Sequence, residues 1–145
     1  VNWYQRRWVI EQWHRVLKEG CRLESAQLDE GEDIQRLAAI LGPVAADLLR
    51  LRDLASDEQQ AQQPARATGV ISEAMIAVVA ASRRTPAQKL TLQQFWRTLA
   101  RRGGHLGRKK DPRPGWSALW FGWQQIAAEA AGYELAMQNM GGRTV

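Results

Sequence analysis

The chain has 145 residues, a net charge of +5 at pH 7, a calculated pI of about 10.0 and a single cysteine. This length can bury a self-sufficient core, the lone Cys21 excludes an intramolecular disulfide, and no apolar run reaches the roughly 18 to 20 residues that span a bilayer. The basic charge weakly favours a polyanionic partner such as nucleic acid.

Helical periodicity dominates the chain, and no alternating pattern predicts a β-strand, so we expect an all-α helical bundle. The first helix is predicted over residues 2–18, just before Gly20. The second begins within residues 29–33, where acidic side chains suit a helix N-terminus, and is expected to continue across Gly42 and Pro43 as one helix with a kink there. Its predicted core face consists of Ile34, Leu37, Leu41, Val44, Leu48, Leu51 and Leu54.

The second half of the chain opens with a segment of different composition. Residues 56–68 are rich in Gln and Ala, lack an apolar stripe and are predicted to form a flexible linker. Short helices follow over residues 70–82 and 91–103, and a basic loop over residues 108–114 leads into a last helix over residues 116–140. A basic loop of this kind is either solvated or in contact with phosphates, and its sequence leaves both open.

The first helix has a polar face that combines four kinds of side chain. At about 100° per residue, Tyr4, Arg7, Glu11 and Lys18 fall within an arc of roughly 60°. The opposite, apolar side consists of Val9, Ile10, Trp13, Val16 and Leu17. A carboxylate among phosphate-binding groups suits a metal ion, although pairing of Glu11 with arginines four residues away is the commoner explanation of the pattern alone.

The spacing of these four residues resembles the signature of the IS-four family of bacterial DDE transposases, in particular its Tn-five-like members. That signature is Tyr, two residues, Arg, three residues, Glu, six residues and Lys. The resemblance extends to the leucine-rich stretch over residues 48–52 and to the tryptophan-rich stretch over residues 116–123. The departures lie mostly in residues 56–90.

The resemblance implies that this is the C-terminal part of a cut-and-paste DNA transposase. It implies that Glu11 is the third carboxylate of an Asp, Asp, Glu triad binding Mg²⁺ or Mn²⁺ in a ribonuclease-H-like core. It also implies that Tyr4, Arg7 and Lys18 contact transposon-end DNA. Residues 1–28 would be the last helix of that core and residues 29–145 a helical dimerisation domain in a cytoplasmic, nucleoid-associated protein.

The sequence begins three residues before Tyr4, whereas the two aspartates of such a triad lie upstream of this helix in the family. We interpret the acidic cluster at Asp29, Glu30, Glu32 and Asp33 as helix-start charges and not as their replacement. We therefore expect the chain to be no enzyme on its own and to bind no metal by itself, because two-metal phosphoryl transfer needs several converging carboxylates.

The last helix carries large and small apolar residues at near-heptad steps, including Trp116 and Met137. Its small residues Gly122, Ala131 and Gly132 predict the close approach of another helix. Packing within the monomer and contact between subunits both fit this pattern. Since the family dimerises through its C-terminal helices, the predicted dimer interface consists of Trp120, Trp123, Ala127 and Ala130. The expected partners are transposon-end DNA and a second copy. The alternative is a stand-alone truncated protein that pairs with a full-length transposase and inhibits it.

Overall fold

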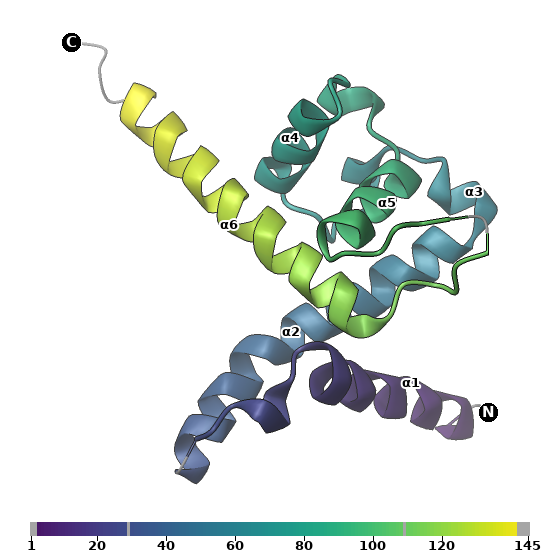
Figure 1. Ribbon diagram of the computed structural model, residues 1–145, viewed down its shortest axis with the longest axis vertical. Helices are drawn as coiled ribbons and strands as arrows, with labels where there is room; N and C mark the ends of the chain where they lie inside the picture. Colours follow the sequence, from purple (N-terminus) through teal and green to yellow (C-terminus); the bar gives the residue numbers. More distant parts are fainter. Residues whose placement is uncertain (1–2, 29, 109, 142–145) are drawn as a thin grey trace.

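The structure is a computed structural model that describes residues 3–28, 30–108 and 110–141 (Figure 1). Asn2, Asp29 and Lys109, which fall within predicted elements, lie outside these ranges. The described chain consists of helices and their connections, and its β structure is limited to an isolated bridge between Pro64 and Thr91. The predicted all-α fold is therefore confirmed.

The first helix, α1 (Trp3–Arg15), continues into a single π-helical turn (Val16–Gly20). The Cys21 N–H donates to the Val16 carbonyl at 2.9 Å, which is the wide i to i+5 bond of a π turn. Val16 and Leu17 are buried there, and the Ser117 hydroxyl donates to the Glu19 carbonyl at 2.9 Å. This turn therefore fixes the end of the first helix against the start of the last one.

The second helix, α2 (Gly31–Ser56), is continuous across Gly42 and Pro43, as predicted. Pro43 lacks an N–H, and beside it the indole N–H of Trp13 donates to the Gly42 carbonyl at 3.0 Å. A Cβ at Gly42 would lie 3.2 Å from the Trp13 ring, so glycine gives that ring its space. Of the predicted core face, Leu41, Leu48 and Leu51 are buried, whereas Ile34 near the start is exposed.

Residues 56–68 form packed structure where the sequence predicts a linker. Asp57 caps the short helix α3 (Glu58–Ala61) by accepting from the N–H groups of Gln59 and Gln60, and a 3-10 turn (Ala65–Thr68) follows. Ala61 and Ala65 are buried. The Ala65 N–H donates to the Leu90 carbonyl at 2.8 Å, and the Leu92 N–H donates to the Gln63 backbone carbonyl at 2.9 Å. Backbone bonds to a distant segment replace the missing apolar stripe, which explains why composition alone misplaced this region.

The remaining helices are α4 (Glu73–Ser82), α5 (Leu92–Arg102) and α6 (Trp116–Gly141). Ser72 caps α4, and Thr91 with Gln94 forms a reciprocal capping box on α5. Helix α6 packs most extensively on α4 and α5. Together with Leu48 and Leu51 of α2, the helices enclose a core that includes Ile76, Phe95, Leu99, Leu119 and Ile126.

The crossing of α5 and α6 depends on glycine. A Cβ at Gly122 would lie 2.0 Å from the Leu99 carbonyl oxygen, and a Cβ at Gly103 would lie 1.6 Å from that of Ala118. Both distances are far below van der Waals contact, so the two backbones meet directly. The small residues that predicted close approach of another helix thus serve, at Gly122, a helix of the same chain.

Helix α6 extends beyond the body of the molecule, by which we mean the packed helices α4 and α5 and the core beneath them. Its first half crosses α5 and α4, and its second half projects beyond them (Figure 1). All residues from 131 to 141 are exposed. No helix in the described ranges is both long enough and apolar enough to cross a membrane.

Candidate DNA and dimerisation surfaces

The polar face of α1 is solvent-exposed, as its predicted role requires. Tyr4 is 83% exposed, and the Arg7 guanidinium bonds the Glu11 carboxylate at 3.0 Å across one helical turn. The structure therefore brings Arg7 and Glu11 together. An exposed pair of this kind contributes about 0.3–0.5 kcal/mol, so an anion or a cation of modest affinity can separate the two charges.

Lys18 lies apart from this pair. It sits in the π turn, where the wider spiral changes its angle around the helix, and its ammonium contacts the Glu24 carboxylate at 2.7 Å. The hydrogen bond and charge of Glu24 raise the pKa of Lys18 above its usual value, although both side chains are exposed. The helix predicted for residues 2–18 is therefore α-helical only to Arg15, and Lys18 belongs to the π turn that continues it.

The apolar side of α1 is only partly covered. Val9 and Ile10 are exposed although the sequence predicts them on the buried side. With Trp13 of α1 and Leu49 and Leu54 of α2 they line an open groove of about 580 Å³. Burial of this side begins at Trp13 and is complete at Val16 and Leu17.

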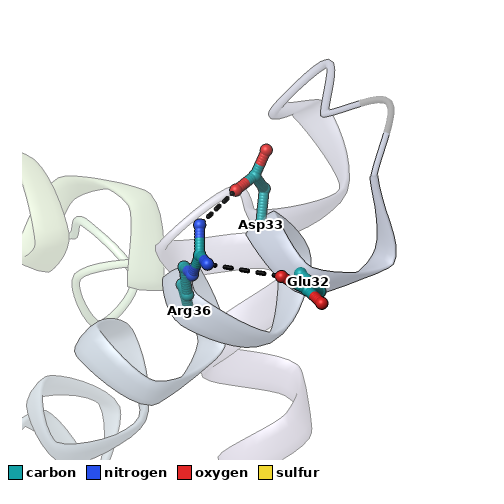
Figure 2. A network of polar contacts seen from close by, with 3 residues as sticks. All are labelled: Glu32, Asp33 and Arg36. Carbon is teal, nitrogen blue, oxygen red and sulfur yellow. Dashed lines mark hydrogen bonds and ion pairs between the residues drawn. The ribbon is translucent and has the colours of Figure 1, made fainter.

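The carboxylates that the structure describes do not gather into a metal centre. Glu32 and Asp33, in the acidic cluster at the start of α2, bond the same arginine, Arg36, at 3.3 and 3.2 Å (Figure 2). This fits the interpretation of the cluster as helix-start charges. Among the described residues, no three His, Cys, Asp or Glu side chains gather as metal ligands, and Glu11 faces Arg7. The residues present thus do not fit a two-ion site by themselves.

The four residues predicted as a dimer interface pack on the chain's own core. Ala130 is 5% exposed, and Trp120, Trp123 and Ala127 are half-buried against the core cluster. A side chain already buried within the monomer gains little from a second copy, since its apolar surface has left water. Most of the apolar side chains that α6 leaves exposed lie further along the helix, at Tyr133, Leu135, Met137 and Met140.

The stripe of α6 that packs on the body continues past it in the same phase. Alternating steps of four and three residues give the heptad pattern of a coiled coil. The members are Leu119, Trp123, Ile126, Ala130, Tyr133, Met137 and Met140. The first four lie on the body, and the last three are exposed on the projecting half. The near-heptad pattern predicted from the sequence includes Met137 but not Tyr133 and Met140, which an unbroken heptad count adds.

Comparison with protein families matches residues 66–141 to the family described as the transposase Tn5 dimerisation domain. The match spans α4, α5 and α6 and covers just over half of the chain. The chain belongs to this family. The expected relation to a transposase and the expected dimerisation function are confirmed at this level.

Proposed function

We propose that the chain is the C-terminal part of a cut-and-paste DNA transposase, in which the Tn5-type dimerisation domain pairs two copies while α1 faces the transposon end. The observation that carries the proposal is the family match over residues 66–141 together with the exposed end of the heptad stripe inside it. In this proposal, Glu11 supplies one carboxylate of an Asp, Asp, Glu site, and Tyr4, Arg7 and Lys18 contact the DNA.

The pairing surface that we propose is the projecting half of α6, through Tyr133, Met137 and Met140. These side chains are the exposed continuation of a stripe that packs well where it meets the body, so they suit a second helix of the same kind. Tyr133 and Met137 also line an open hollow with Ala74 and Ala77 of α4, into which a partner helix could settle. Methionine adapts its shape to such contacts.

The expected association is weak. Three side chains from each copy, at about 1.5–3 kcal/mol for full burial, give roughly 9–18 kcal/mol in total as an upper estimate. Association costs about 4–15 kcal/mol in lost freedom, and the midpoints of the two ranges leave only about 4 kcal/mol, so the net affinity is weaker than micromolar. DNA bound across two copies would raise the effective concentration of one for the other.

A pair of charge substitutions on α6 tests this surface. Met137→Arg places a cation on the proposed contact, whereas Leu135→Arg places it on the opposite side of the helix at a similarly exposed position, 61% against 51%. In sedimentation across a hundredfold range of concentration, we expect the wild type and Leu135→Arg to associate and Met137→Arg to remain monomeric, all three melting at similar temperatures.

Two results would contradict the pairing surface. One is association that survives Met137→Arg, and the other is association lost equally in Leu135→Arg. Ala130→Arg does not serve in this test, because an arginine at that buried position would disturb the packing of α6 on the body as well as any dimer.

A further inference from the structure

Three adjoining hollows form a groove that runs from α1 across the end of α2 to α5. The first, of about 460 Å³, lies among Trp8, Arg52, Arg113 and Trp116, and the second, of about 260 Å³, shares Arg52 and Arg113 with it. The third, of about 380 Å³, shares Pro114 with both and Trp96 with the second. The connection between α5 and α6 forms one wall, through Arg113 and Pro114.

Positive charge dominates this groove. Arg97 and Arg101 stand one helical turn apart on α5 beside His105, and Arg52 and Arg113 line the other two hollows. Asp53 is the acidic residue among the lining side chains, and its carboxylate bonds Arg52 at 3.2 Å. A cleft lined by one sign of charge concentrates ligands of the opposite sign.

Tryptophan rings alternate with these cations. The Arg52 guanidinium carbon lies 4.7 Å from the centre of the Trp116 ring and 6.0 Å from that of Trp8, both within cation–π range. Trp8 remains 53% exposed, so part of its ring is open to a ligand. Trp96 contributes a further indole between the second and third hollows.

We propose that this groove, defined by Trp8, Trp96, Trp116, Arg52, Arg97, Arg101 and Arg113, binds single-stranded nucleic acid. Arginines along the groove neutralise successive phosphates, and the exposed ring of Trp8 offers a flat surface for a base. Cationic grooves with interleaved aromatic rings bind single strands in this way with little regard to sequence. Trp8 stands about one helical turn from both Tyr4 and Glu11 on α1, so the groove adjoins the face that they form, but the proposal does not depend on the role of Glu11.

An acidic peptide is the other polyanion that such charges could attract. Its carboxylates would use the arginines but leave the tryptophan face without a partner, because aspartate and glutamate carry no aromatic ring. A base stacked on Trp8 uses both features of the groove, with a contribution that is largely independent of salt. For this reason we favour the nucleic acid and let the peptide serve as a competitor.

The experiment measures the affinity of the full 145-residue chain for a labelled oligothymidine of about twelve nucleotides, by fluorescence anisotropy over a series of NaCl concentrations. Arg97→Ala with Arg101→Ala should lower the log–log salt slope by about 1.4, at about 0.7 for each phosphate contact on a single strand. Trp8→Ala should weaken binding roughly fivefold or more without changing the slope, and Trp8→Phe should restore most of the affinity.

Two controls match these variants. Arg36→Ala with Lys89→Ala removes the same charge from exposed positions outside the groove and should leave the slope unchanged. Arg7→Ala with Lys18→Ala should weaken binding of a duplex but not of the oligothymidine, which separates the groove from the DNA contacts proposed for α1. Circular dichroism of each variant verifies folding.

The inference is supported if the groove pair lowers the salt slope, the control pair does not, and Trp8→Ala weakens binding with recovery in Trp8→Phe. It is overturned if both double variants lower the slope equally, or if Trp8→Ala binds as tightly as the wild type. Displacement of the oligothymidine by dodecaglutamate at equal concentration would overturn it as well, because that result reports charge without stacking.

Discussion

At the scale of single residues, the sequence predicted contacts that arise within one regular helix and missed those that depend on its end. Arg7 and Glu11 stand four residues apart in α1, so ordinary helix geometry places their side chains in contact. Lys18 pairs instead with Glu24, because the π turn rotates it and the chain then folds back. Helical periodicity alone carries no signal for a π turn.

Cys21 leads to a pH prediction at the same scale. Burial raises the pKa of its thiol from 9.0 to about 11. The folded chain therefore holds the thiol proton more tightly than the unfolded chain, and its stabilising effect is complete below pH 9 and lost as the pH rises towards 11. We expect the urea midpoint to fall more steeply between pH 8 and 10.5 in the wild type than in Cys21→Ala.

The comparison of slopes isolates the thiol, since lysine and tyrosine groups titrate in both proteins. Equal slopes would show that the thiolate is as well solvated in the folded state as in the unfolded chain. A thiol-specific reagent should likewise react slowly with the native protein at pH 8 and rapidly in urea.

At the scale of elements, periodicity located the long helices but did not identify their neighbours. The predicted spans for α2, α4, α5 and α6 agree with the structure to within a few residues, because caps and glycines mark their ends. Gly122 predicted a close helix contact but not its partner, α5, since any helix with a small enough face would fit. Residues 56–68 were missed because their order comes from bonds to residues 90–92.

Two glycines on α6 provide a matched test of this packing. A methyl group at Gly122 would meet the Leu99 carbonyl, whereas one at Gly132 would meet nothing within 4 Å. Gly122→Ala should therefore destabilise the fold by about 1–3 kcal/mol or more, as overpacking does. Gly132→Ala should stabilise the exposed helix by roughly 0.5–1 kcal/mol. Thermal unfolding measures both, and a Gly122→Ala protein as stable as the wild type would refute the direct backbone contact.

At the scale of the whole molecule, the sequence supported a transposase relation through a motif in α1, and the family match supports it through α4 to α6. The motif and the family match lie in separate parts of the chain, so each supports the relation to a transposase independently of the other. Among the described residues, Glu11 pairs with Arg7, and no three potential metal ligands gather.

A functional prediction follows for the chain as a whole. With Mg²⁺ or Mn²⁺ present, it should neither nick nor join transposon-end DNA above background, since a lone carboxylate cannot position two ions for phosphoryl transfer. Incubation with supercoiled and linear DNA, beside a Glu11→Ala control, tests this. Metal-dependent cleavage that Glu11→Ala abolishes would mean that the chain builds a site of its own.

The projecting half of α6 also bears on helix–coil equilibrium. Its residues are an extension of a helix whose first half is held by the core, so the unfavourable nucleation step is already made and only propagation remains. Without tertiary contacts, the free energy of adding each further residue to the helix is close to zero, and Gly132 makes it less favourable. Pairing of two copies would supply the missing contacts, so helix content and assembly would rise together, and the order of this segment would depend on how many partners are present.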